Sequence, residues 1–280
     1  MAESIKDRVA IIGMGCTKFG ENWDKSFDDM LVEAAYEAFG DAGIEPKDVQ
    51  AAWLGTCFLA MATGMALSVP LRLQYKPVTR VENACATGSD ALRNATYAVA
   101  AGIYDIALAI GVEKLKDSGF SGLAVSGGVT AGVGPTATAP GMFAMMATTY
   151  FSRYGLAPDE GKRMLAHIPV KSHHNGSLNP RAHFQREVSL ETVLKAPIIA
   201  WPLGLYDCCG NSDGAAAAII VRAEDAKKFR PDPVYIKALQ IATSSGEEML
   251  YDDDWTHVES SVRAARSAYQ EAGISNPRQQ

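Results

Sequence analysis

Cys85 is the residue whose surroundings in this sequence best suit chemistry. It follows a strand-like run at residues 77–81 and precedes a stretch of small residues at 89–101 that is typical of a helix. The N-terminus of a helix offers free backbone N–H groups and the positive end of the helix dipole, which together favour a thiolate. The sequence therefore predicts that Cys85 is a nucleophile for a carbonyl carbon.

The residues around Cys85 are small enough to admit a substrate. Ala84, Ala86 and Gly88 would let a carbonyl group approach the backbone. Their amides are candidates for an oxyanion pocket. A cysteine is more often a small buried hydrophobe, and that interpretation is favoured for the other four, which are Cys16, Cys57, Cys208 and Cys209.

Cysteine and histidine spacing gives no sign of a disulfide scaffold or a metal centre. The chain has 5 cysteines, an odd number, in a sequence long enough to build a large core. It contains no Cys-x-x-Cys pair and no His-Glu-x-x-His motif. We therefore predict no metal site.

Strands and helices alternate along the chain, which predicts parallel βαβ units in layers. Ser26 is a candidate cap for the first helix, and Gly43 follows the end of that helix. The expected strands are 9–12, 51–54, 77–81, 106–111, 215–221 and 233–241, and the expected helices are 27–39, 61–73, 89–101, 142–154, 158–173 and 258–272. The Gly- and Ala-rich segment 118–140 is either a functional loop or a linker.

Composition excludes several classes of protein. The chain has 280 residues, 48% hydrophobic and 21% charged, and a net charge of −6 without a long basic run. A nucleic-acid groove or an anionic-membrane patch is therefore not expected. No signal peptide or membrane-length apolar run is found, which predicts a cytoplasmic protein. Gly13 and Gly15 follow a strand, but Gly20 is misplaced for a dinucleotide-binding motif.

A short pattern occurs twice in the sequence. Residues 41–44 read Asp-Ala-Gly-Ile at the end of the first helix, and residues 271–274 read Glu-Ala-Gly-Ile at the end of the last. One interpretation is that a second βα half begins near Pro233. The other is chance similarity between two amphipathic helices.

Four segments resemble the thiolase family, in the branch of sterol-carrier-protein thiolases and archaeal acetyl-CoA acetyltransferases. The segment Asn83-Ala84-Cys85-Ala86-Thr87-Gly88 resembles the nucleophile motif of that family. Residues 9–20 resemble the opening strand and turn of the branch. Residues 171–173 with 179–180 resemble its Lys-Asn-His and Asn-Pro segment, and residues 207–216 its Ser-Asp-Gly-Ala-Ala-Ala segment.

The resemblance implies a thiolase-like layered α/β/α/β/α sandwich that is incomplete in its second half. Residues 1–232 would form the N-terminal thiolase half, with an inserted loop region at about 118–205 over the CoA and acyl pocket. Residues 233–280 would begin the C-terminal half. A homodimer or higher oligomer is the usual assembly of the family.

The implied activity is acyl transfer through a cysteine acyl-enzyme. A 3-oxoacyl-CoA would be cleaved, or formed by Claisen condensation, with coenzyme A as a substrate and no tightly bound cofactor. Cys209 falls near a position that lines the CoA channel in family members. Met145, in a methionine-rich stretch, is either part of an adaptable apolar pocket or a packing residue. A ketoacyl synthase is a related possibility. The segments at 171–180 and 207–216 favour the thiolase branch over it.

The sequence departs from the family after residue 232. Family members carry their remaining active-site groups in His-Asp, Gly-His-Pro and Cys-Gly motifs of the second half, and residues 233–280 contain none of them. His257 matches none of the three. We expect these groups to come from further sequence or from a partner chain. The alternatives are a non-catalytic or partner-dependent subunit, or a retro-aldolase acting on a CoA-linked side chain with a small zinc-ribbon/OB-type partner.

Overall fold

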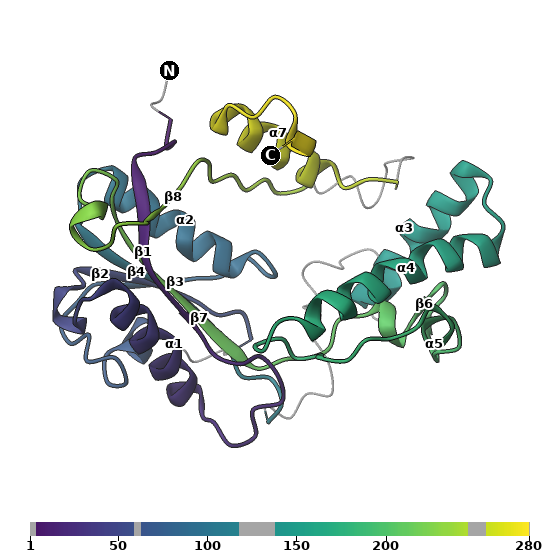
Figure 1. The fold of residues 1–280 in the computed structure, drawn as a ribbon, viewed down its shortest axis with the longest axis horizontal. Helices are drawn as coiled ribbons and strands as arrows, with labels where there is room; N and C mark the ends of the chain where they lie inside the picture. Colours follow the sequence, from purple (N-terminus) through teal and green to yellow (C-terminus); the bar gives the residue numbers. More distant parts are fainter. Residues whose placement is uncertain (1–3, 59–62, 118–137, 246–255, 280) are drawn as a thin grey trace. The chain divides into compact units, whose positions relative to one another are not determined.

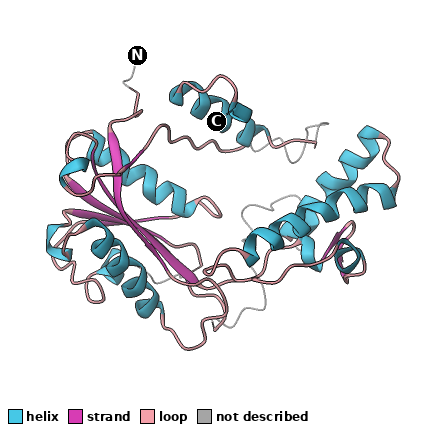
Figure 2. Ribbon diagram, viewed as in Figure 1, coloured by secondary structure: helices cyan, strands magenta, loops and turns pink. Residues whose placement is uncertain are grey.

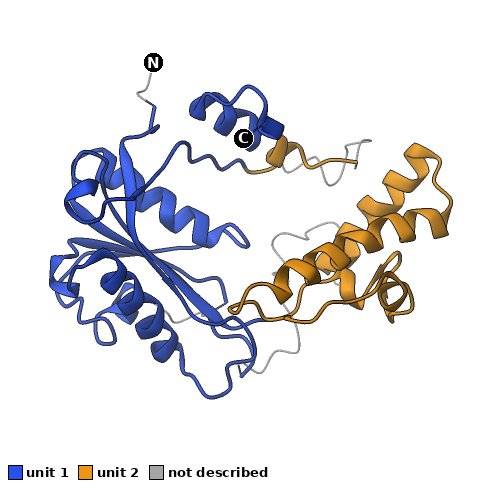
Figure 3. Ribbon diagram, viewed as in Figure 1, with its two compact units in different colours: residues 1–118, 212–242, 263–280 blue, residues 119–211, 243–262 orange. Residues whose placement is uncertain are grey.

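Two compact units make up the chain, and Figure 3 shows them in different colours. The computed structural model describes residues 4–58, 63–117, 138–245 and 256–279. The first unit comprises residues 1–118, 212–242 and 263–280, and the second comprises residues 119–211 and 243–262. Most of the Gly-rich segment 118–140 lies outside the described residues.

A mixed six-stranded sheet forms the centre of the first unit, in the order β3-β2-β4-β7-β1-β8 (Figures 1 and 2). The strands are β1 (Val9–Cys16), β2 (Ala51–Gly55), β3 (Val78–Val81), β4 (Ile106–Glu113), β7 (Gly214–Arg222) and β8 (Val234–Tyr235). Strand β2 is parallel to β3 and β4, as expected. Strand β7 is antiparallel to both β4 and β1, so the expectation of purely parallel units was wrong for this strand.

Helix α1 (Phe27–Ala42) begins where the sequence predicts, and it extends past the expected residue 39 to the predicted cap at Gly43. Ser26 and Asp29 form a capping box, and Gly43 adopts φ +67° at the C-terminal cap. Met30 and Leu31 belong to its fully buried face, and burying such a side chain contributes about 1.5–3 kcal/mol. The helix packs on β1 and β7 in the larger hydrophobic core.

Helix α2 (Thr87–Ala100) packs on the opposite face of the same sheet (Figure 1). Along β4, Ala107 and Ala109 belong to a core with α2, whereas Leu108 and Ile110 belong to the core with α1. This alternation follows from the period of two in a strand. Both faces of the central strands are therefore buried, which explains the unbroken apolar run at 106–111.

The second unit is mainly helical. It contains α3 (Ala139–Tyr154), α4 (Pro158–Ser177), α5 (Leu190–Leu194), β5 (Ile198–Ala200) and β6 (Leu203–Gly204). Helices α3 and α4 confirm the predictions at 142–154 and 158–173. They pack closely, because a Cβ added at Gly161 of α4 would lie 2.5 Å from the ring of Phe151 in α3.

Two predicted elements are shorter in the structure. The strand expected at 233–241 is reduced to β8, which pairs with Ala10 and Ile11 of β1. The helix expected at 61–73 is a 3-10 turn, η2 (Gly64–Leu67), in its described part. Helix α7 (Glu259–Ala272) confirms the last prediction, and its Glu271 accepts a hydrogen bond from the Ile5 N–H at 3.1 Å.

Candidate active site

Cys85 lies in the turn between β3 and α2, as predicted. Strand β3 ends at Val81, α2 begins at Thr87, and the Cys85 side chain is exposed. The N-terminal cap of α2 is Ala86, which supplies no side-chain cap. The first turn of a helix has N–H groups without intrahelical acceptors, so this end of α2 favours negative charge, such as an oxyanion, placed against it.

The turn before Cys85 is held in an uncommon backbone conformation. Ala84 has φ +45°, in the left-handed region, where a residue with a Cβ pays about 1–2 kcal/mol. The Thr87 hydroxyl accepts a hydrogen bond from the Asn83 N–H at 2.8 Å and donates one to the Ala84 carbonyl at 2.6 Å. Thr87 is buried, so the first residue of α2 fixes the loop that carries the cysteine.

A second cysteine approaches the same turn from the adjacent strand. Cys57 follows β2, and its thiol donates a hydrogen bond to Glu82 Oε1 at 3.5 Å. Burial, then the hydrogen bond to the Glu82 carboxylate and its charge, with smaller contributions from Glu113 and Cys85, raise the pKa of Cys57 to about 11. Cys57 is therefore a neutral thiol at physiological pH.

Glu113 fixes the loop that carries Cys57. This residue ends β4, and its carboxylate accepts hydrogen bonds from the backbone N–H groups of Cys57 and Phe58, the latter at 3.2 Å. It also accepts one from the Thr56 hydroxyl at 3.2 Å. Cys57, Cys85 and Glu113 thus come from the carboxyl ends of three neighbouring parallel strands, the edge where α/β proteins commonly bind ligands.

Glycines let α2 approach this edge of the sheet. A Cβ added at Gly55 would lie 3.1 Å from Thr87 Cγ2 and 3.2 Å from the Thr87 carbonyl oxygen. At Gly111 the added atom would lie 3.9 Å from Gly88 Cα. The absence of a side chain at Gly55 therefore lets the N-terminus of α2 sit close to the end of β2, whereas an added Cβ at Gly111 would make only ordinary contact.

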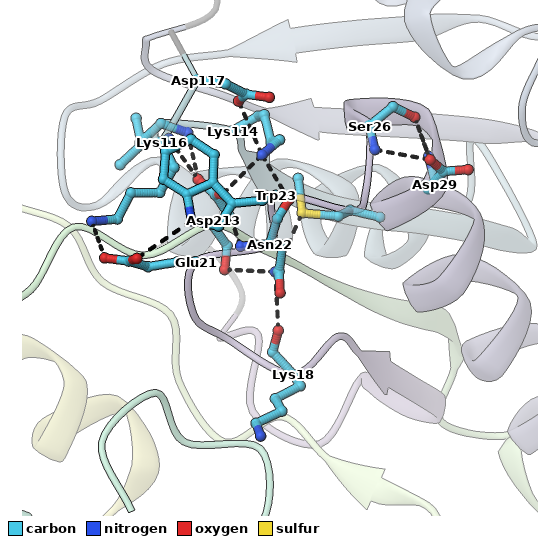
Figure 4. Close-up of polar contacts among 12 residues, drawn as sticks. Lys18, Glu21, Asn22, Trp23, Ser26, Asp29, Lys114, Lys116, Asp117 and Asp213 are labelled. Carbon is cyan, nitrogen blue, oxygen red and sulfur yellow. Dashed lines mark hydrogen bonds and ion pairs between the residues drawn. The ribbon is translucent and has the colours of Figure 1, made fainter. Parts of the chain in front are cut away.

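Asp213 holds the loops beside this edge together (Figure 4). Its carboxylate, 0% exposed, accepts hydrogen bonds from the backbone N–H groups of Leu115 at 2.6 Å and Asn22 at 3.2 Å, and from Lys114 Nζ at 3.0 Å. Burial alone would raise the pKa of Asp213, but the hydrogen bonds from Leu115, Lys114 and Lys116 outweigh it and lower that pKa. Asp213 and Lys114 therefore form an ion pair. The contacts of Asp213 fix three chain segments relative to one another.

A buried ion pair also organises the loop that bears Cys208 and Cys209 in the second unit. Lys162 of α4 pairs with Asp207, and Asp207 Oδ2 accepts a hydrogen bond from the Gly204 N–H at 2.7 Å. Burial, then the charge of Asp207, raises the pKa of Cys208. The next thiol, Cys209, is exposed.

The three residues that the sequence singled out do not share one described site. Cys85 belongs to the first unit, and Cys209 and Met145 belong to the second. Met145 lies on α3 with 41% of its surface exposed. The CoA-binding role of Cys209 and Met145 stays a prediction. In the same unit, the ring of His173 contacts those of Phe184 and Tyr206, with centroids 5.7 and 5.5 Å apart.

Sequence reasoning overlooked Cys57, Glu82 and Glu113 as parts of the site. Each of them ends a strand or follows the end of one by at most two residues. The carboxyl ends of parallel neighbours meet at one edge, so their positions in the sequence were the available signal. The strand order, which brings β2 between β3 and β4, was the missing information.

Among the residues that the structure describes, no group of three or more His, Cys, Asp or Glu side chains is arranged to hold a metal ion. Within the same residues, no helix combines the length and apolar character needed to cross a bilayer.

Comparison with known proteins shows where this fold belongs. The family model for "Thiolase, N-terminal domain" matches residues 9–224. Acetyl-CoA acetyltransferase from Methanothermobacter thermautotrophicus is 39% identical over 278 residues, which are 95% of this chain and 70% of the relative. Sterol carrier protein 2 from Gallus gallus is 28% identical over 98% of this chain and 52% of the relative.

A solved structure also has a similar fold. The Ltp2-ChsH2(DUF35) aldolase superposes with a TM-score of 0.81 at 26% identity, covering 98% of this chain and 71% of that one. Fold and sequence together define an α/β acyltransferase. The chain belongs to the thiolase family, in the branch of the archaeal acetyl-CoA acetyltransferases and the sterol-carrier-protein thiolases.

Proposed function

We propose that the chain transfers acyl groups to and from coenzyme A through an acyl-enzyme on Cys85. The observation that carries this proposal is the position of Cys85, exposed on a strained turn at the N-terminus of α2. An exposed thiol at a helix N-terminus is a stronger nucleophile than a core thiol. Within the same edge of the sheet, Cys57 is held as a neutral thiol, which leaves Cys85 as the candidate nucleophile.

The reaction proceeds in two half-reactions. The Cys85 thiolate attacks the keto carbon of a 3-oxoacyl-CoA, forming a carbon–sulfur bond. The bond between the keto carbon and its neighbour then breaks, and the acetyl-CoA enolate that leaves takes up a proton. In the second half, the thiol of coenzyme A loses its proton, attacks the thioester carbonyl and releases Cys85 as a thiolate. The reverse sequence is a Claisen condensation.

The proton transfers need groups beyond those of the described site. We propose that they come from further sequence or from a partner chain, with coenzyme A as a substrate and no tightly bound cofactor. A homodimer or higher oligomer accompanies this proposal as a prediction from the family resemblance, and a cytoplasmic location stays a prediction from the sequence.

Intact-protein mass spectrometry after incubation with substrate tests the proposal. A 3-oxoacyl-CoA reports the whole first half-reaction. A simple acyl-CoA reports only thioester exchange, which needs the nucleophile and an oxyanion pocket but no enolate chemistry. We expect an acyl adduct on the unsubstituted chain and none on Cys85→Ala.

A control substitution and the comparison of the two substrates distinguish the possible results. Cys16→Ala, in β1, should leave the adduct unchanged. An adduct from the acyl-CoA but not from the 3-oxoacyl-CoA would place the missing proton-transfer groups on another chain. If neither substrate modifies a folded chain together with any co-purifying polypeptide, the Cys85 mechanism is wrong.

A retro-aldolase that works with a small zinc-ribbon/OB-type partner is the second candidate. It is favoured by the aldolase whose structure aligns with 98% of this chain. A retro-aldol cleavage passes through no cysteine thioester, so the two candidates differ in one readout. Cleavage of a 3-hydroxyacyl-CoA that survives Cys85→Ala would support the aldolase, and cleavage of a 3-oxoacyl-CoA that is lost in that variant would support the thiolase.

A further inference from the structure

The Glu82 carboxylate joins the two cysteine-bearing loops. Its Oε1 atom accepts a hydrogen bond from the Ala84 N–H at 2.6 Å and another from the Cys57 thiol at 3.5 Å. Ala84 is the residue with φ +45°, directly before Cys85. One oxygen atom therefore contacts both the strained residue of the nucleophile turn and the thiol that follows β2.

The strained conformation of Ala84 requires support from both of its peptide groups. Alanine does not favour the left-handed region, so such a conformation persists only where the surroundings over-determine it. The Thr87 hydroxyl binds the carbonyl of Ala84 at 2.6 Å. Glu82 binds the N–H of the same residue. Glu82 and Thr87, the first residue of α2, thus hold Ala84 from both sides, one at its N–H group and the other at its carbonyl group.

We propose that Glu82 is a positioning residue, which holds Ala84 in its left-handed conformation and so directs the Cys85 thiol at the acyl carbon. This inference rests on the proposed role of Cys85 as the nucleophile. Glu82 itself makes no bond to substrate in this scheme. Removing its hydrogen bond lets the turn relax and moves the nucleophile away from the reactive geometry, to which rates of such reactions are highly sensitive.

The same carboxylate also contributes to the raised pKa of Cys57. Burial contributes most to the raised pKa of Cys57, and the hydrogen bond and charge of Glu82 come next, followed by Glu113 and Cys85. Removing the charge of Glu82 therefore lowers the pKa of Cys57 from about 11, while burial and Glu113 keep it above the usual value. Alkylation of Cys57 therefore reports the loss of the Glu82 charge, whereas acylation of Cys85 reports the loss of the hydrogen bond to Ala84.

Two substitutions separate the hydrogen bond from the charge. Glu82→Gln keeps an oxygen that accepts from the Ala84 N–H but removes the charge, whereas Glu82→Ala removes both. Glu45→Ala is the control, because Glu45 is exposed, pairs with Lys47 and precedes the opposite end of β2. The acylation rate of Cys85 by an acyl-CoA is measured by mass spectrometry of the intact chain, and the alkylation of Cys57 by iodoacetamide is followed by peptide mass spectrometry from pH 7 to 11.

We expect Glu82→Ala to slow acylation of Cys85 by about tenfold to a hundredfold. Glu82→Gln should retain the rate within about threefold, and in both variants the alkylation of Cys57 should rise at lower pH. Acylation of Glu82→Ala at the unsubstituted rate would overturn the positioning role. An equal loss in both variants would overturn it too, since the oxygen acceptor would then not matter. Acylation that fails even in the unsubstituted chain would instead overturn the proposed function on which the role rests.

Discussion

Lys114 Nζ lies 3.0 Å from Asp213 Oδ2, and Asp213 has no exposed surface. Lys114 belongs to the segment after β4, and Asp213 directly precedes β7. The two residues therefore join neighbouring strands at the edge of the sheet where Cys85 lies. They are 99 positions apart in the sequence, and residues 119–211 of the second unit are inserted between them.

Asp213→Asn should destabilise the first unit by about 3 kcal/mol, because it removes the buried carboxylate partner of the Lys114 ammonium and leaves that ammonium paired with the exposed Asp117. Urea unfolding followed by circular dichroism measures the change. Lys195→Met provides the matched control, since it breaks the exposed Lys195–Glu191 pair and should cost less than about 0.5 kcal/mol. Equal effects of the two substitutions would show that burial of the Asp213 pair carries no stability.

The same carboxylate should make stability depend on pH in the acid range. The pKa of Asp213 is lowered from 3.8 in the folded chain, so its contribution is present above that value and is lost as the pH falls through the lower folded pKa. Urea unfolding between pH 6 and pH 3 should therefore show a steeper loss of stability for the unsubstituted chain than for Asp213→Asn. Parallel curves would contradict an ionised Asp213.

Gly15→Ala should destabilise the chain by about 1–3 kcal/mol, because the added Cβ would lie 2.2 Å from the Ala34 carbonyl oxygen and force α1 away from β1. Gly40→Ala, inside α1, provides the opposite test. Its Cβ would meet no atom within 4 Å, and alanine in a helix is favoured over glycine by about 0.5–1 kcal/mol. Thermal unfolding of both variants measures the difference, and a stabilising Gly15→Ala would contradict the close packing.

Ala84→Val should reduce both stability and acylation of Cys85, because a β-branched residue is strongly disfavoured at φ +45°. We expect a loss of unfolding free energy beyond the cost that alanine already carries in this conformation, because the second branch at Cβ adds steric crowding. Ala84→Gly, which adopts a left-handed conformation without this penalty, should retain acylation. Comparison of the two variants by mass spectrometry checks the expectation, and full acylation of Ala84→Val would show that the turn is not constrained.

Local signals in the sequence were sufficient for most helices and strands. Ser26 and Gly43 predicted the ends of α1, since capping depends on residues within one turn of the helix. The position of Cys85 between a strand and a helix could be predicted for the same reason. The short strand β8 was overestimated because an apolar run does not show how many of its residues find a pairing partner.

Relationships between distant segments could not be predicted in this way. Asp213 was noticed only as part of a family motif, and its contacts with Lys114 and Asn22 depend on the placement of β7. Glu82 and Cys57 are 25 positions apart, and only the pairing of β2 with β3 brings them together. In the sequence alone, Glu82 looks like an ordinary surface glutamate and Cys57 looks like an ordinary buried cysteine.

The central position of β7 in the sheet has a consequence for folding during synthesis on the ribosome. Strand β4 is complete at Glu113, but its partner β7 is complete only at Arg222. A ribosome that adds about 5–20 residues per second leaves β1 and β4 without the strand between them for roughly 5–20 s. During that interval, the edge of β4 that β7 will cover is open to wrong pairing.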